Sequence, residues 1–336
     1  MNTAVKNTVP ADKIFSVNSC NFTETALELF HFQHQNNRVY RQFCDTLHAD
    51  ISKIDSLNKI PFLPISFFKT HTVVSTEFSH EAVFESSGTT QTINSKHLVK
   101  DIDLYKRSFS NAFQLFYGNP ADWCIIALLP SYLERKNSSL VLMADQLIAQ
   151  SQHPRSGFYL DELQQLQGVL QELELQQQKT LLIGVTFALL DFAEQYPMPL
   201  QHTVIMETGG MKGRREEITR QQVHEILTAA FKTTNIHSEY GMTELLSQAY
   251  SKGNGVFNCP PWMKILIREE DDPFAISTAG KKIIVTGAIN VIDLANIYSC
   301  SFIATDDAGK LYADGSFEIL GRLDNSDIRG CSQLSL

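Results

Sequence analysis

The sequence lacks the patterns that mark several broad classes of protein. Its six cysteines are scattered without a C-x-x-C pair, which argues against a zinc site and against a disulfide framework. No run of apolar residues approaches the roughly 20 that a membrane span requires, and the N-terminus has no apolar core of signal-peptide length. We therefore expect a cytoplasmic protein with reduced thiols and no membrane span.

Positive charge is also in short supply. The chain has 28 Lys and Arg residues against 37 Asp and Glu, which gives a formal net charge of -9. Such a surface repels a phosphate backbone, so we expect no nucleic-acid partner. A phosphate-bearing ligand would instead need positive charge supplied locally, by magnesium, a few basic side chains and backbone N–H groups.

The residues that are present are those of a folded α/β protein. Hydrophobic residues make up 43% of the 336, which is enough for a large core. Between residues 101 and 231, apolar runs typical of buried strands alternate with stretches of helical periodicity. Helices are predicted at 101–117, 138–149, 160–175, 187–195 and 216–231, and strands at 122–130, 179–186 and 202–210. This alternation predicts an open sheet of parallel strands covered by helices, with ligands bound at the carboxyl ends of the strands.

Two further regions flank this core. Residues 21–58 carry apolar positions at helical spacing, whereas two prolines within residues 60–71 predict extended chain. From residue 255 onward short strands and turns dominate, which predicts a smaller β-rich subdomain. We expect a helical lead-in and an α/β nucleotide-binding core at 1–254, followed by a β-rich subdomain with a short tail at 255–336.

The stretch SSGTTQTINSK, residues 86–96, concentrates hydroxyls around one glycine and ends in a lysine. Hydroxyl and backbone N–H groups can approach a phosphate closely there because glycine adds no bulk. A Walker-type P-loop is excluded, since the G-x-x-x-x-G-K-[ST] pattern is missing. The alternative is an ordinary turn with helix-capping hydroxyls. The candidate phosphate-binding residues are Ser86, Ser87, Gly88, Thr89, Thr90 and Lys96.

The pentapeptide YGMTE, residues 240–244, offers further groups for a nucleotide. Tyr240 can stack on adenine, Thr243 can donate to a phosphate oxygen, and Glu244 can bind a hard cation such as Mg²⁺. The alternative is a capping box that starts a helix at Thr243 or Glu244. His97, just after the first motif, lacks the spacing of a metal ligand, so we interpret it as structural or solvent-facing.

Two later motifs, ATDD at 304–307 and GRLDNSDIRG at 321–330, complete a set. In this order the four motifs resemble those of the adenylate-forming superfamily: [ST]SGTTGxPK, YGxTE, a TGD-like element and GRxDxxI(K/R)xxG. Within it the chain most resembles LuxE-type acyl-protein synthetases and phenylacetate-CoA-ligase-like enzymes, over residues 84–330. The resemblance implies the large N-terminal domain of the adenylate-forming fold, with the small C-terminal lid domain absent.

The resemblance also implies roles for the first two motifs. Residues 86–90 would close over the β- and γ-phosphates of ATP. Tyr240 and Gly241 would line the adenine pocket, and Thr243 would touch the α-phosphate. Glu244 would hold Mg²⁺.

The same comparison assigns roles to later residues. Asp307 would bind the ribose hydroxyls, with Arg322 nearby. Asp306 stands where the family has the glycine of TGD, which leaves the choice between the two aspartates open. The turn formed by Gly209 and Gly210 matches a loop that borders adenine and the acyl substrate in the family.

Two departures from the family pattern concern catalysis. Gln91 replaces a second glycine, so the phosphate loop is expected to be stiffer or differently shaped. Many relatives take a catalytic lysine from the lid domain that this chain lacks. Lys96, Lys212, Arg329 and a partner protein are the candidates to replace it.

The function implied is ATP- and Mg²⁺-dependent activation of a carboxylic acid as acyl-AMP, followed by acyl transfer to a thiol. The 21 phenylalanines suit a tunnel for a fatty acid, and core packing explains them equally well. The acceptor would be a protein cysteine, an acyl carrier or CoA. Cys331 resembles in position an acyl-accepting cysteine of the luminescence synthetases; the alternative is a free cysteine on a frayed tail. Two other functions stay open: an acyltransferase that uses a preformed thioester, and a non-catalytic nucleotide-binding subunit of an acyl-reductase complex.

Overall fold

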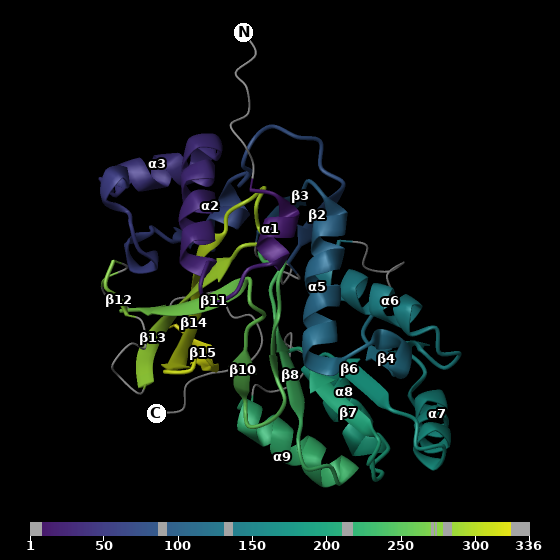
Figure 1. The fold of residues 1–336 in the computed structure, drawn as a ribbon. Coiled ribbons are helices and arrows are strands. Elements are labelled where there is room, and N and C mark those ends of the chain that lie inside the picture. Colours follow the sequence, from purple (N-terminus) through teal and green to yellow (C-terminus); the bar gives the residue numbers. More distant parts are fainter. Residues whose placement is uncertain are drawn as a thin grey trace. The chain divides into compact units, whose positions relative to one another are not determined.

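The computed structural model describes residues 9–86, 93–130, 137–209, 218–269, 272, 274–277 and 284–323. The chain folds into two compact units (Figure 1). The first unit comprises residues 1–108, 242–248 and 259–319, and the second comprises 109–241, 249–258 and 320–336. The chain therefore passes from one unit to the other inside the YGMTE motif, between Gly241 and Met242.

The second unit is built on parallel strands in the spatial order β5-β4-β6-β7-β8, continued by antiparallel β9 and β10. Their bounds are β4 Cys124–Leu128, β5 Gly157–Phe158, β6 Thr180–Gly184, β7 Thr203–Glu207, β8 His237–Tyr240, β9 Ala249–Ser251 and β10 Val256–Asn258. β4 and β6 are buried along their whole length, which explains their continuous apolar sequences because both faces of a parallel sheet are covered. Gly184, Glu207 and Tyr240 end neighbouring parallel strands and so share one edge of this sheet.

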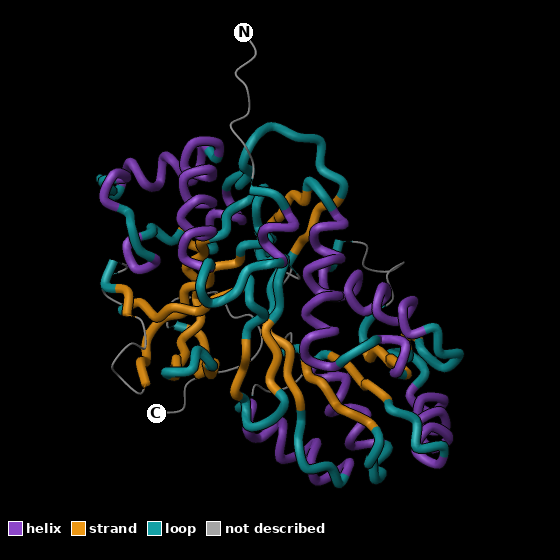
Figure 2. The backbone as a smooth tube through the Cα atoms, in the orientation of Figure 1, coloured by secondary structure: helices purple, strands orange, loops and turns teal. Residues whose placement is uncertain are grey.

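Helices connect the parallel strands, as the tube drawing shows (Figure 2). They are α6 Ser139–Ser151, α7 Leu163–Leu175, α8 Thr186–Gln195 and α9 Arg220–Phe231, with a 3₁₀ turn at Pro120–Asp122. α9 begins with a capping box between Thr219 and Gln222. α8 and α9 pack through stacked rings of Phe192 and Phe231, whose centroids lie 5.7 Å apart. α5, Ile102–Tyr117, begins in the first unit and ends in the second.

The first unit combines N-terminal helices with antiparallel strands. Its helices are α1 Ala11–Phe15, α2 Phe22–Asn36, α3 Arg38–Thr46 and α4 Phe67–Thr70, with 3₁₀ turns at Ile51–Lys53 and Leu57–Lys59. Its strands are β1 Leu63–Pro64, β2 Ala82–Glu85, β3 Lys96–Val99, β11 Met263–Arg268, β12 Ile276–Ser277, β13 Ile284–Asp293 and β14 Phe302–Tyr312. The order β12-β11-β13-β14 is antiparallel, β1 runs parallel to β14, and β2 and β3 form a separate hairpin. β15, Phe317–Arg322, follows β14 and ends in the second unit.

The core of the first unit contains a cluster of aromatic rings beneath α2 and α3. Phe30, Tyr40 and Phe302 are fully buried, and the ring centroid of Phe30 lies 6.1 Å from that of Tyr40 and 6.2 Å from that of Phe302. Tyr40 also donates from its hydroxyl to the Pro61 carbonyl at 2.6 Å, so the buried polar end of the ring is satisfied. The helical lead-in is therefore part of the core of this unit.

The predicted α/β fold, with parallel strands, covering helices and antiparallel strands toward the C-terminus, is confirmed. The prediction of extended chain at 60–71 was partly wrong, because α4 forms at Phe67–Thr70. Proline restricts the residue before it, and the four residues of α4 follow Pro64 without meeting another proline. The division of the chain into domains at residue 254 stays a prediction.

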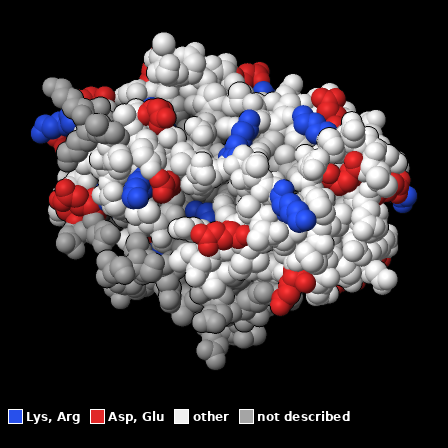
Figure 3. All heavy atoms as spheres, turned by 90° about the horizontal axis from the view of Figure 1, so that it is seen from below, with Lys and Arg blue, Asp and Glu red and all other residues white. Residues whose placement is uncertain are grey.

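The face of the molecule drawn in Figure 3 carries basic and acidic side chains interspersed among uncharged residues. No helix within the described ranges is both long enough and apolar enough to cross a membrane.

Candidate functional site

The SSGTT motif joins β2 to β3 in the first unit. Ser86 lies at the start of the loop, and Ser87, Gly88, Thr89 and Thr90 fall outside the described residues. The Ser86 N–H donates to the Ser95 carbonyl at 3.1 Å, and the Ser95 N–H donates to the Ser86 hydroxyl at 2.9 Å. These reciprocal bonds draw the two ends of the loop together. The ammonium of Lys96 is largely exposed and lies 3.5 Å from a carboxylate oxygen of Glu85 across the hairpin.

His97 links this hairpin to the YGMTE segment. Its ring is 2% exposed, and Nδ1 lies 3.0 Å from the Thr243 carbonyl oxygen. Because a carbonyl can only accept, Nδ1 carries the hydrogen. Burial lowers the pKa of His97 to about 4, and the bond to Thr243 opposes that shift. A neutral imidazole thus holds β3, which follows the first motif, next to the Thr243 backbone within the first unit. This is a structural role, in agreement with our interpretation of the sequence.

The YGMTE segment begins at the last residue of β8 and continues as a loop. β8 ends at Tyr240, and residues 241–248 form turns and irregular chain rather than a helix. The alternative of a helix-starting capping box at Thr243 or Glu244 is therefore wrong. Tyr240 and Gly241 belong to the second unit, and Thr243 and Glu244 belong to the first.

The end of β13 anchors the residues around Glu244. The Glu244 side chain is buried, and the backbone carbonyl of Glu244 accepts from the Asn296 side-chain amide at 2.8 Å. The buried carboxylate of Asp293 accepts from the backbone N–H groups of Leu246 at 2.7 Å and Ser247 at 3.0 Å, and from the Ser247 hydroxyl at 2.6 Å. Burial raises the pKa of Asp293 to about 6, although these donors act in the opposite direction.

Helix α2 supports this anchor from the other side. The buried Gln33 amide donates to the carbonyls of Asn296 at 2.8 Å and Ile297 at 3.1 Å, and its oxygen accepts from the Ser301 N–H at 2.9 Å. Asn37 donates to the Ser299 carbonyl at 3.0 Å. The helical lead-in therefore fixes the turn between β13 and β14 that holds Glu244, a function that the sequence analysis did not foresee.

Asp307 lies on β14, beside an irregularity in the pairing with β13 between Ala288 and Asn290. Its N–H donates to the Thr305 hydroxyl at 3.2 Å. Because Ala308 pairs with Ala288, Asp307 lies beside the part of β13 that is about four residues from Asp293. At the usual rise of a strand this is a separation of about 13 Å. Asp307 is thus on the same pair of strands as the anchor of Glu244, but some distance along it.

Arg268 of β11 supports the strand beneath Asp307. Its guanidinium donates to the Ile289 carbonyl at 2.8 Å, the Asn290 side chain at 2.7 Å and the Thr305 carbonyl at 2.7 Å. No pattern in the sequence marks this residue. Arg322, the predicted neighbour of Asp307, is the last residue of β15 and belongs to the second unit.

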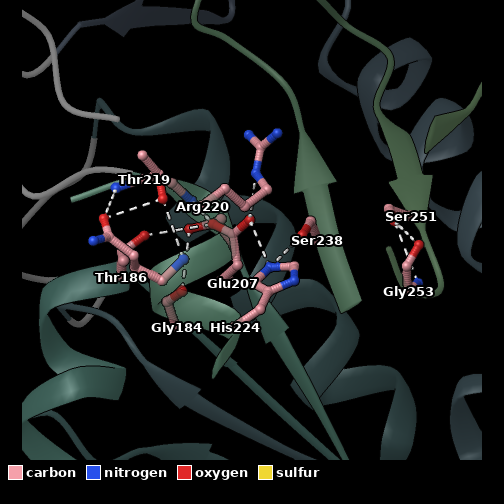
Figure 4. A network of polar contacts seen from close by, with 12 residues as sticks. Gly184, Thr186, Glu207, Thr219, Arg220, His224, Ser238, Ser251 and Gly253 are labelled. Atoms are coloured by element: carbon pink, nitrogen blue, oxygen red, sulfur yellow. Dashed lines mark hydrogen bonds and ion pairs between the residues drawn. The ribbon is translucent and has the colours of Figure 1, made fainter. Parts of the chain in front are cut away.

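The carboxyl ends of β7 and β8 in the second unit carry a further polar cluster (Figure 4). Glu207, the last residue of β7, is 3% exposed. Its carboxylate accepts from the Gly209 N–H at 2.8 Å and pairs with Arg220 Nε at 3.2 Å, while His224 Nε2 lies 3.7 Å away. Burial raises the pKa of Glu207, but the contacts with His224, Arg220 and Ser238 outweigh it and lower the pKa to about 2. Glu207 was not predicted from the sequence, whereas the glycine turn that follows it was. Gly210 of that turn lies outside the described residues.

Tyr240 is connected to this cluster through Phe257. The two rings pack edge to face with centroids 6.0 Å apart, and the Arg220 guanidinium lies 5.2 Å from the centroid of Phe257. Tyr240 itself is 9% exposed. The predicted adenine-lining tyrosine thus packs on a ring that the Arg220 guanidinium, paired with buried Glu207, covers.

The predicted metal and thiol chemistry can be compared with the described residues. Within the described ranges, no three His, Cys, Asp or Glu side chains gather to hold a metal ion. Mg²⁺ is usually bound by only one or two carboxylates together with phosphate oxygens, so Glu244 alone could serve as its protein ligand. That role stays a prediction. Cys331, Lys212 and Arg329 lie outside the described residues.

The described cysteines differ in their access to solvent. Cys20 is exposed, whereas Cys44, Cys124 and Cys300 are buried. Burial raises the pKa of Cys44 to about 12 and that of Cys124 to about 11. Because the thiolate is the nucleophile, buried thiols of this kind are poor acyl acceptors.

A sequence model of the family described as acyl-protein synthetase, LuxE, matches residues 12–336. The chain belongs to this family. The predicted resemblance to adenylate-forming enzymes of the LuxE type is confirmed. No curated protein matches the chain.

Solved structures share the fold of this LuxE-family chain. ATP-bound MatB from Rhodopseudomonas palustris matches with a TM-score of 0.52 and 17% identity, over 72% of this chain and 48% of that one. An ATP-bound RpMatB-BxBclM chimera, B3, matches with a TM-score of 0.53 and 16% identity, over 74% and 50%. Apo MatB from the same organism matches with a TM-score of 0.50 and 17% identity, over 74% and 49%. The chain spans about half the length of these structures, and at this identity the likeness concerns the fold.

Proposed function

We propose that this LuxE-family chain uses ATP to activate a carboxylic acid and then passes the acyl group to a thiol. The bond between His97 and Thr243, which holds the β2–β3 hairpin that carries the SSGTT motif against the Thr243 backbone of YGMTE, is the observation that carries the proposal. Both segments belong to the set of motifs that resembles adenylate-forming enzymes. ATP bound to structures of the same fold adds support.

The first proposed step forms an acyl adenylate. A carboxylate oxygen attacks the α-phosphorus of ATP, the bond to the β-phosphate oxygen breaks, and pyrophosphate leaves. Residues 86–90 would hold the β- and γ-phosphates, Thr243 the α-phosphate, and Asp307 with Arg322 the ribose. Mg²⁺, held by Glu244, would supply positive charge against the phosphates. Lys96 is the proposed source of further charge, because its ammonium is exposed beside the loop.

The second proposed step transfers the acyl group. A thiolate attacks the acyl carbonyl, the bond to AMP breaks, and a thioester forms. We propose a fatty acid as the substrate and Cys331, an acyl carrier or CoA as the acceptor, with an acyl reductase as a candidate partner in the cytoplasm. The buried cysteines Cys44, Cys124 and Cys300 are unsuited to this step.

Acid-dependent exchange between pyrophosphate and ATP tests the first step. A series of fatty acids of different lengths should support exchange, and Glu244→Gln should reduce it about 100-fold, as expected for the loss of one preorganised electrostatic contact. Glu225→Gln, on the exposed face of α9, is the matched control and should exchange like the wild type. Absence of exchange with every acid tested would overturn the proposal.

Acyl labelling tests the second step. Radiolabelled fatty acid and ATP should leave label on the protein that neutral hydroxylamine removes, as a thioester requires. Cys331→Ser should abolish this label, whereas Cys20→Ser, at an exposed cysteine, should retain it. Full labelling of Cys331→Ser would exclude Cys331 as acceptor, and exchange without labelling would point to a separate thiol.

A further inference from the structure

Glu207 connects four elements of the second unit at the edge where three parallel strands end. One carboxylate oxygen accepts from the N–H of Gly209 at 2.8 Å and lies 3.4 Å from the hydroxyl of Thr186, the first residue of α8. The other oxygen faces Arg220 and His224 on consecutive turns of α9. His224 in turn lies 3.3 Å from the Ser238 hydroxyl on β8. Ligands of open α/β sheets bind at this kind of edge.

Gly209 depends on this carboxylate for its orientation. Its φ angle is +73°, in the left-handed region that favours glycine, and a Cβ there would meet no atom of the described residues within 4 Å. Glycine is therefore required by the backbone conformation and not by lack of space. The Glu207 carboxylate holds the N–H of this residue, and so sets the direction in which the chain leaves β7.

Arg220 carries the same constraint to Tyr240. Its Nε pairs with Glu207, and its guanidinium covers the Phe257 ring on which the Tyr240 ring packs. This largely buried ion pair is at best a modest source of stability, because desolvation of Glu207 offsets the attraction between the charges. The pair matters more for geometry than for stability. The planar guanidinium of Arg220 fixes the spacing between the end of β7 and the rings of Phe257 and Tyr240.

We infer that Glu207 and Arg220 are positioning residues that set the Gly209 turn and the Tyr240 ring as two walls for the adenine base. This inference rests on the proposed function, in which both walls border adenine. It assigns to the pair a contribution to recognition of the base, separate from the phosphate contacts proposed for the first unit.

Binding measurements on matched variants test the inference. Arg220→Met keeps an apolar chain over Phe257 but leaves Glu207 without its charge partner, and Glu207→Gln keeps an acceptor for Gly209 but removes the charge. Arg220→Lys restores the charge without the planar group and guards against loss of folding in the other two. Arg155→Met is the control, because Arg155 forms an ion pair with Glu172 on the surface of the same unit.

Affinity for ATP with Mg²⁺ and affinity for inorganic tripolyphosphate are measured in parallel. We expect Arg220→Met to lower the affinity for ATP about tenfold and to leave the affinity for tripolyphosphate within twofold of the wild type. Arg220→Lys should recover part of the loss, and Arg155→Met should match the wild type for both ligands. An equal loss of affinity for both ligands would overturn the inference. Unchanged affinity for ATP in Arg220→Met, Arg220→Lys and Glu207→Gln would also overturn it.

Hydrogen–deuterium exchange of the full-length chain supplies a readout that needs no nucleotide. Peptides that contain Gly209 should exchange faster in Glu207→Gln and Arg220→Met than in Arg155→Met, and unchanged exchange would contradict the positioning role. A wild-type chain that binds no ATP would instead refute the proposed function, and with it the assignment to adenine. The two failures are therefore distinguishable.

Discussion

The burial of His97 predicts a specific loss of stability in acid. The ring is 2% exposed, its pKa is lowered from 6.5 to about 4, and it packs against Phe68 and Phe84 with centroid distances of 5.7 and 6.4 Å. The folded-state pKa lies below the unfolded one, so the unfolded chain takes up the proton first as the pH falls. The full stability is thus present above about pH 6.5 and is lost progressively toward pH 4.

The size of this effect follows from the difference between the two pKa values. Between about pH 7 and about pH 4.5, His97 alone should reduce the free energy of unfolding by about 2.5 kcal/mol. His97→Asn keeps a donor near the position of Nδ1 and cannot titrate, so its stability should fall less over the same range. At neutral pH this variant should start about 1–3 kcal/mol below the wild type, because the ring contacts are lost.

Urea unfolding at several pH values measures both the loss of stability at neutral pH and its dependence on pH. His80→Asn, at an exposed position, is the control and should follow the wild-type dependence on pH. His237 also has a pKa lowered to about 4, through burial and Lys252, so the wild type should lose more stability in acid than His97 alone explains. A His97→Asn variant that loses stability in acid as steeply as the wild type would refute the reasoning.

Two other substitutions should change stability for reasons visible in the structure. Gln33→Leu removes the partner of the Asn296 carbonyl and of two other buried backbone groups, and should cost about 2–4 kcal/mol in urea unfolding; a cost below about 1 kcal/mol would contradict the role given to Gln33. Gly184→Ala would place a Cβ 2.9 Å from Cβ of Leu128 and should cost about 1–3 kcal/mol, whereas Gly168→Ala, within α7 and with open space, should stabilise by about 0.5–1 kcal/mol. Equal effects of the two glycine substitutions would show that packing at the end of β6 is not the cause.

The elements with strong patterns were predictable from the sequence. β4 and β6 are continuous apolar runs because they are buried on both faces, and the periodicity of α7 matches its buried residues. The short α4 was not predictable in this way, since four residues give no full period. The loops that carry the motifs were identified by their composition rather than by their conformation.

The residues that hold the motif loops in place within each unit were largely missed, for a physical reason. Glu207 and Asp293 act through single carboxylates whose partners are distant in sequence, and one acidic residue after an apolar run forms no recognisable pattern. Gln33 did leave a signal, because it is a polar residue on the buried face of α2 beside Leu29 and Phe30. A polar side chain on an apolar helix face is therefore worth examining when a site is sought from sequence.

The interleaving of the two units has a practical consequence for protein engineering. The chain crosses between them at 108/109, 241/242, 248/249, 258/259 and 319/320, so no continuous gene fragment encodes either one. A chimera made with a single crossover would join incomplete halves, with the cut through YGMTE among the worst choices. Exchange of substrate preference between relatives should therefore be attempted by grafting individual loops onto an intact chain.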